Sequence, residues 1–185
     1  MSTYKLAMAL AAVITVTTLP VVAADDTPNL GSPISQEEIS GWDITVFPNG
    51  KGLPVGNGTA AQGSEIYAAK CIACHGDKGL GGLGPTLISD RKRQGIDEAG
   101  ETIANYWPFS TSVFDYIRRA MPWQSPKSLT NEEAYALTAF ILEENKLIPP
   151  GTVVDANSLP KVRMPNRAGF VLRFPKLTPP IATSK

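Results

Sequence analysis

Both cysteines and the only histidine of the 185-residue chain lie within five consecutive positions, in the stretch KCIACH that ends at His75. Thiols and imidazoles act as nucleophiles, exchange disulfides and bind metals. Two cysteines separated by two residues occur in redox-active disulfides, in zinc sites and where haem is attached covalently. The residues around the motif indicate which of these chemistries fits best.

Two of the three alternatives find little support in the flanking sequence. A redox-active CxxC pair of the thioredoxin type normally follows a buried strand of a βαβ unit. Here a helical pattern precedes the motif and a glycine-rich loop follows it. A structural zinc site normally takes two ligand pairs from separate parts of the chain, and no second Cys or His pair exists. A carboxylate could complete a zinc site, so that alternative stays open.

Covalent attachment of haem c accounts for the order Cys71, two spacers, Cys74 and then His75. The two thiols add across the vinyl groups of adjacent pyrrole rings. Two spacer residues on a helical turn let both sulfurs reach one edge of the macrocycle, and the next side chain, His75, then faces the iron. We therefore expect one covalent haem c with His75 as an iron ligand.

Few residues can ligate the other face of the iron. With one histidine in the chain, bis-histidine ligation from this chain alone is excluded, and Met1 and Met8 fall in a segment that we expect to be removed. Met121, between two expected helices, is favoured over Met164 in the irregular tail, although either could instead fill a gap in the core. If both do, the sixth coordination site is open or taken by a weaker ligand such as a lysine. His/Met ligation saturates the iron, which suits one-electron transfer better than substrate binding.

Residues 1–24 have the layout of a secretory signal peptide, with Lys5, an apolar run and small residues before a cleavage site after Ala23 or Ala24. An uncleaved membrane anchor is the alternative, but the apolar run is short for a span and ends near Pro20. No later segment is apolar enough to cross a bilayer. We therefore expect export to the bacterial periplasm.

The mature chain, of about 160 residues, suits one domain with extensions. The expected order is an irregular N-terminal extension over 25–58, a domain over 59–147 and an extended tail over 148–185. The extension holds at most one short strand, at 44–46. Expected helices run from Thr59 or Ala60 to the cysteines, over 97–105, over 110–121 and over 130–146. The fold class is therefore all-α.

Local signals set the expected helix ends and faces. Ser112 with Asp115 predicts an N-terminal cap, and Pro122 ends that helix. Thr130 and Glu133 form a capping-box pattern. The last helix has one apolar face, made by Ala134, Leu137, Phe140 and Ile141.

Loss of Lys5 with the signal leaves the mature chain near −1, which gives no support for nucleic-acid binding. The charges are unevenly spread, since residues 25–50 carry five acids and no base, whereas residues 151–185 carry six bases and Asp155 alone. The two ends could pair with each other, face partners, or be solvated tails.

Aromatic and basic side chains lie between the cysteines and Met121. Trp107, Arg118 or Arg119 could hold a haem propionate. Alternatively, Trp107 is a core residue and the arginines cover a helix face. Trp123 is a further candidate for the haem pocket, and the sequence does not assign Trp42 to the domain or to a partner.

Further motifs resemble those of class I cytochromes c over residues 59–147. Gly63-x-x-x-Tyr67 resembles the family's glycine-aromatic element, which crosses the last helix at a face that corresponds to Leu137 and Phe140. The stretch GPTL resembles the segment after the haem motif. The resemblance implies that the Pro85 carbonyl accepts the hydrogen bond from His75 Nδ1 and that Leu87 packs on the haem.

A narrower likeness covers most of the mature chain. The stretches WDITVFPNGKGLP, YWPFSTSVFDYIRRAMPWQ and SLPKVRMPNRAGF are similar to the cytochrome subunits of sulfane dehydrogenases of the Sox sulfur-oxidation pathway and of related sulfite dehydrogenases. The likeness implies a periplasmic molybdenum enzyme of the sulfite-oxidase type as electron donor, with a further acceptor downstream. A haem enzyme acting directly on a small sulfur compound is the alternative. Sox subunits can carry two haem domains, whereas this chain has one CxxCH.

Overall fold

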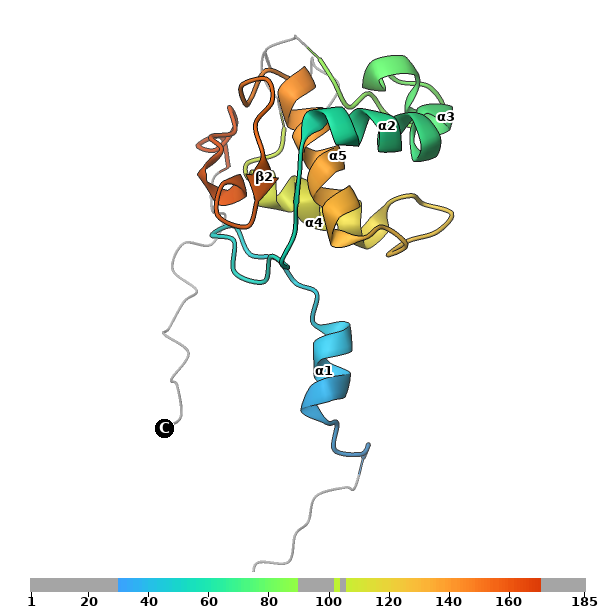
Figure 1. Cartoon of the computed structure of the whole chain (residues 1–185). Coiled ribbons are helices and arrows are strands. Elements are labelled where there is room, and N and C mark those ends of the chain that lie inside the picture. Colours follow the sequence, from blue (N-terminus) through green and yellow to red (C-terminus); the bar gives the residue numbers. More distant parts are fainter. Residues whose placement is uncertain (1–29, 90–101, 104–105, 171–185) are drawn as a thin grey trace, which may run out of the picture. The chain divides into compact units, whose positions relative to one another are not determined.

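The computed structural model describes residues 30–89, 102–103 and 106–170. Contacts divide the chain into residues 1–38 and a domain that begins at Ile39. In the described residues, helices account for most of the regular structure, and the sheet is a two-residue ladder (Figure 1). The elements are α1 (Gln36–Trp42), β1 (Asn57–Gly58), α2 (Ala60–Lys70), α3 (Ile72–His75), η2 (Asp77–Gly79), α4 (Ser110–Ala120), α5 (Asn131–Glu144), β2 (Val154–Asp155) and η3 (Leu159–Lys161).

The domain is built around the crossing of α2 and α5. A Cβ at Gly63 would lie 2.0 Å from the Ala136 carbonyl oxygen, so only glycine allows the two backbones to lie this close. One turn further along α2, the Tyr67 ring packs on Phe140 with centroids 5.0 Å apart. The close crossing implied by the family resemblance is confirmed.

Helix α5 lies at the centre of the core. Every residue from Ala134 to Leu142 is buried, including the four predicted for its apolar face. The burial extends around the helix because α2, α4 and the β1–β2 ladder all pack against it. Thr138 is buried without a lost hydrogen bond, since its hydroxyl donates to the Ala134 carbonyl at 2.7 Å.

Capping boxes begin both crossing helices. The Thr59 side chain accepts from the Gln62 amide and Thr130 accepts from the Glu133 amide, and each glutamine or glutamate side chain accepts from the cap's own amide. Lys70 forms an ion pair with Glu133 and so links the end of α2 to the start of α5. Both predicted starts are confirmed.

The predicted cap of α4 is wrong. Ser112 lies inside the first turn, and the helix begins at Ser110 after an extended Phe109 that makes no side-chain cap. The buried Ser110 hydroxyl donates to the Leu159 carbonyl at 2.6 Å, so packing against the C-terminal segment determines where this helix starts. Helix α4 ends at Ala120, before Pro122, as predicted.

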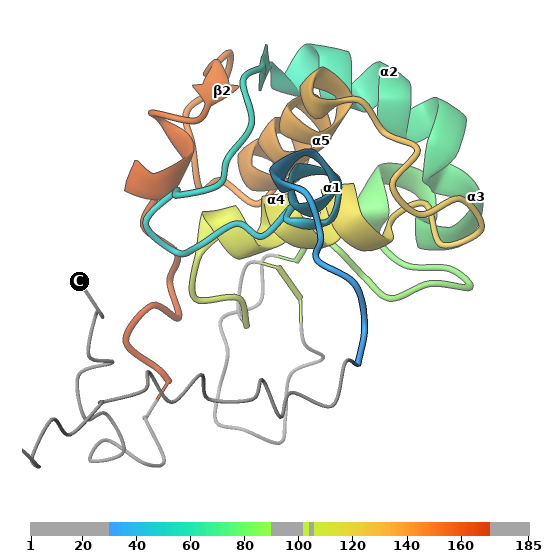
Figure 2. The ribbon, with the colours of Figure 1, turned by 90° about the horizontal axis from the view of Figure 1, so that it is seen from below.

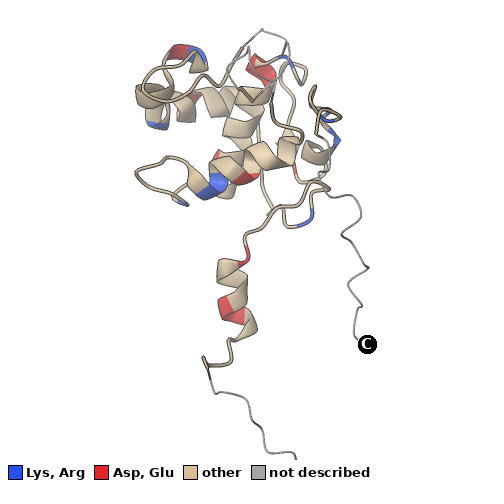
Figure 3. Ribbon diagram, turned by 180° about the vertical axis from the view of Figure 1, so that it is seen from behind, with Lys and Arg blue, Asp and Glu red and all other residues tan. Residues whose placement is uncertain are grey.

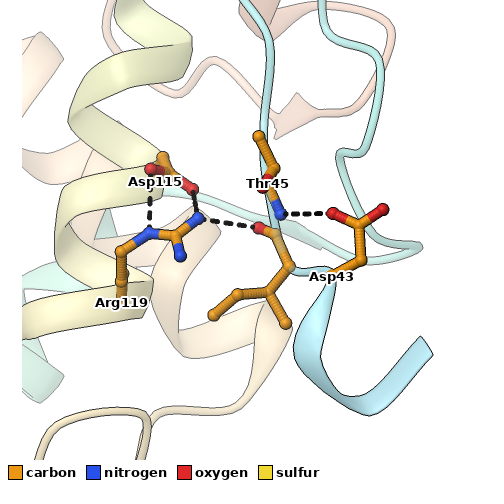
Figure 4. Close-up of polar contacts among 5 residues, drawn as sticks. Asp43, Thr45, Asp115 and Arg119 are labelled. Atoms are coloured by element: carbon orange, nitrogen blue, oxygen red, sulfur yellow. Dashed lines mark hydrogen bonds and ion pairs between the residues drawn. The ribbon is translucent and has the colours of Figure 1, made fainter. Parts of the chain in front are cut away.

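No strand forms at residues 44–46, where the sequence allowed at most a short one. Residues 44–55, called the strap below, have no strand partner and instead accept hydrogen bonds from helix side chains. Their carbonyl acceptors are Ile44 (from Arg119), Pro48 (from Thr111), Pro54 (from Tyr135) and Val55 (from Asn131). Figure 4 shows the first of these contacts. The strand that does form pairs Gly58 with Val154.

The segment after α5 packs on the domain and is less extended than expected. Leu159, the first residue of the short helix η3, and Met164, three residues after the end of η3, both belong to the core. Asn166 donates to the Tyr106 carbonyl at 2.7 Å. In Figure 2 the segment lies beside the strap and α5. The signal segment, most of the expected helix at 97–105 and the tail beyond 170 lie outside the described residues.

None of the helices described here is both long and apolar enough to cross a bilayer.

Replacing Gly63 by alanine should lower the free energy of unfolding by roughly 2–3 kcal/mol, because the new methyl group forces α2 away from α5. Denaturant unfolding measures this change. Gly41→Ala is the control, because a Cβ there meets nothing within 4 Å, and it should change the free energy by less than about 0.5 kcal/mol. Equal stability of the two variants would contradict a close crossing.

Candidate haem site

Cys71 lies at the junction between α2 and α3. Cys71 is the C-cap residue of α2 and the N-cap residue of α3. Its carbonyl accepts hydrogen bonds from the amides of Cys74 at 3.1 Å and His75 at 3.0 Å. The motif therefore occupies one helical turn directly after the crossing helix. Both cysteines are half-buried. Because the motif follows α2 directly, the α2–α5 crossing determines where the two thiols lie.

The glycine-rich loop folds back over this turn. The Gly84 amide donates to the Cys74 carbonyl at 2.7 Å, and the Gly81 amide donates to the His75 carbonyl at 2.8 Å. A Cβ at Gly84 would lie 3.0 Å from His75 Cε1, and one at Gly76, which has a φ of +74°, would lie 2.1 Å from the Gly81 carbonyl oxygen. The sequence shows the glycines, but only the structure shows that the close approach to His75 requires them.

His75 Nδ1 lies 2.9 Å from the Pro85 carbonyl oxygen. A carbonyl can only accept, so Nδ1 carries the proton and Nε2 keeps its lone pair for a metal. This is the contact that the family resemblance implied for Pro85. The structure thus brings His75 and Pro85 together in an arrangement that holds the ring ready to ligate iron.

Leu87 and the loop around it are joined to α5. Leu87 is half-buried against the core, and its amide donates to the Gly79 carbonyl at 2.8 Å. Asn145, at the end of α5, donates to the Leu87 carbonyl at 3.0 Å and accepts from the Ser89 amide at 3.0 Å. The Tyr67 hydroxyl donates to the Gly76 carbonyl at 2.8 Å. The sequence indicated Tyr67 as the aromatic residue of the helix crossing but not this contact, and it did not indicate Asn145 as a residue that positions the loop.

The two candidate methionines differ in burial. Met164 is 3% exposed and belongs to the hydrophobic core. Met121 is half-buried, lies outside that core and has extended backbone at the end of α4. In Figures 1 and 2, α3 and the segment after α4 project on the same side of α5. Of these two methionines, Met121 is therefore the one whose thioether lies outside the core, and its role as an iron ligand stays a prediction.

Trp107 packs partly on the core. Its ring lies 5.5 Å from Tyr116 and 6.4 Å from Tyr106, centroid to centroid. Trp123 is 82% exposed, so the structure does not place it in a pocket wall. Arg119 pairs with Asp115 at 2.9 Å and donates to Ile44, which supports the structural role for this arginine (Figure 4). The roles of Trp107 and Arg118 toward haem stay predictions.

The cysteine environment disfavours the two rival chemistries. Burial raises the pKa of the Cys71 thiol to about 11, whereas a redox-active CxxC pair needs a lowered thiol pKa. Among the residues that the structure describes, no three Cys, His, Asp or Glu side chains converge as a metal site would require. Two thiols on one turn, an oriented imidazole and a thioether outside the core do fit a covalent haem.

Comparisons with known proteins agree with this geometry. The sequence model of the cytochrome c family matches residues 60–144. A chain in the crystal structure of the sulfane dehydrogenase SoxCD from Paracoccus pantotrophus superposes with a TM-score of 0.73 and is 34% identical. The alignment covers 86% of this chain and 79% of that chain. A search of curated proteins gave no match.

The match with the SoxCD chain extends beyond the cytochrome c domain, and the family implies a covalently bound haem c. The chain belongs to the cytochrome c family, as a class I c-type cytochrome that resembles a chain of SoxCD.

Proposed function

We propose that this chain carries single electrons on one haem c, attached through Cys71 and Cys74 and ligated by His75 and Met121. The observation that carries the proposal is the His75–Pro85 contact of 2.9 Å, which fixes the imidazole with Nε2 free. The burial of Met164 supports Met121 as the second ligand. A haem with His and Met ligands supplies a one-electron couple without an open coordination position.

Residues of this chain orient the His75 imidazole toward the iron position. The Pro85 carbonyl accepts the hydrogen bond from the Nδ1–H group of His75 and so raises the basicity of the ligating nitrogen. Gly84 leaves room for the ring, while Tyr67 and Asn145 fix the loop that carries Pro85. Exposed apolar side chains at Ile72, Leu80 and Leu83 lie in the motif and its loop, which supports electron exchange with a docked protein.

The partner in this proposal is a periplasmic molybdenum dehydrogenase of the sulfite-oxidase type, which oxidises a sulfur compound and passes electrons to this chain. A second acceptor then takes them onward. The likeness to a chain of SoxCD, over most of both chains, supports this assignment. The proposal includes export to the periplasm with cleavage after Ala23 or Ala24, which the signal-peptide layout of residues 1–24 supports.

Replacing each methionine by leucine in turn distinguishes the iron ligand from the methionine that only fills the core. Met121→Leu should abolish the methionine-to-iron charge-transfer band in the far-red absorption spectrum and lower the reduction potential. Met164→Leu keeps a buried apolar side chain of similar volume and should keep the band. A band that survives in Met121→Leu, or is lost only in Met164→Leu, would refute the assignment.

Purification of the tagged chain from its native host tests the partner. We expect a co-purifying protein that contains molybdenum, and we expect the haem to become reduced when sulfite or thiosulfate is added. Removing the molybdenum protein should abolish the reduction. If the isolated cytochrome oxidises the sulfur compound by itself, the chain is an enzyme and the carrier proposal fails.

A further inference from the structure

We propose that residues 30–43, called the arm below, are a docking element that binds an apolar groove with a basic rim on the electron-donating dehydrogenase. This inference rests on the proposed function and names a binding surface for its partner. The strap that follows the arm is bonded to α4 and α5 at four carbonyls, whereas all fourteen residues of the arm are exposed.

The arm contains the short helix α1, none of whose residues is buried. Ser35 and Glu38 form a capping box, with the Ser35 amide donating to Glu38 at 2.9 Å and the Glu38 amide donating to the Ser35 hydroxyl at 3.2 Å. The sequence thus encodes the start of α1. The helix has seven residues and none is buried. Helices this short are marginal in water without a packing partner, so α1 is suited to binding a surface.

The apolar side chains of the arm suit that surface. Ile39 and Trp42 are three residues apart on α1 and so share one face. Trp42 is 77% exposed, and Leu30 and Ile34 extend the apolar series before the helix. Tryptophan is enriched among the residues that dominate binding energy at protein interfaces. A helix that lays an apolar face into a groove is a recurrent recognition mode.

The acidic residues of the arm indicate that the rim of the partner's groove is basic. The arm carries Glu37, Glu38 and Asp43 and has no lysine or arginine. In Figure 3 the ribbon of α1 is coloured for acidic positions and for no basic ones. An acidic helix with an apolar face is complementary to an apolar groove lined by lysines and arginines.

The strap connects the arm to the haem side of the domain. The arm ends where Ile44 accepts a hydrogen bond from Arg119 at 3.2 Å, two residues before Met121. Asp115 accepts from the same guanidinium, at 2.9 and 3.2 Å, and raises the pKa of Arg119 (Figure 4). The chain that follows the arm is therefore bonded to α4, the helix that ends just before the proposed iron ligand, which favours an electron donor over an unrelated partner.

Steady-state reduction of the haem by the co-purified molybdenum dehydrogenase tests the arm. An arm variant combines Ile34→Ser, Ile39→Ser and Trp42→Ser. Its KM for the cytochrome should rise about tenfold with kcat unchanged, because docking is weakened and electron transfer is not. The control variant combines Val55→Ser and Val153→Ser, which are exposed outside the arm, and should keep the wild-type KM.

Charge reversal gives a second comparison. Glu37→Lys should raise KM, whereas Glu144→Lys, an exposed acid at the end of α5, should not. Dithionite should reduce every variant as it reduces the wild type, which shows that the haem site is intact.

An arm variant with the wild-type KM would overturn the inference. So would sedimentation of the wild-type chain alone as a dimer that the arm variant does not form, since the occupant would then be a second copy. If the dehydrogenase fails to reduce the wild-type chain, the proposed function itself fails. The wild-type measurement therefore separates that failure from a failure of the arm.

Discussion

The close approach of α2 and α5 at Gly63 is the constraint on which the site depends. Because a glycine Hα faces the Ala136 carbonyl, the two helix backbones lie against each other and hold the end of α2 at a fixed place on the core. Cys71 follows that end directly, and the loop after the motif returns to α5 through Asn145. The helix crossing therefore determines the positions of the thiols, His75 and Pro85 relative to the core.

Features set by local sequence could be predicted. The starts of the two crossing helices, the capping box at Thr130 and the end of α4 depend on residues a few positions apart. The start of α4 could not be predicted, because Ser110 bonds to Leu159, 49 residues away. The contacts of the strap could not be predicted for the same reason, since the donors to its carbonyls are side chains of α4 and α5 that are distant in sequence.

Tertiary packing also distinguishes the two methionines, which local sequence does not, since proline follows both. Met164 is buried by a C-terminal segment that looked like an unstructured tail, whereas Met121 stays at the margin of the core. The N-terminal extension divides in a similar way. Its second half is bonded to the domain, and its first half keeps an apolar, acidic surface exposed. Segments outside the cytochrome c domain thus fill the core in one case and offer a binding surface in the other.

The central claim is that Cys71 and Cys74 hold one haem through two thioether bonds. Mass spectrometry of the exported, matured chain under denaturing conditions tests it most directly, because only a covalent group survives unfolding. The account predicts a red protein whose denatured mass exceeds that of the polypeptide by one haem. Replacing either cysteine by serine should leave a single bond and a changed haemochrome spectrum. A colourless chain with the mass of the bare polypeptide would contradict the account.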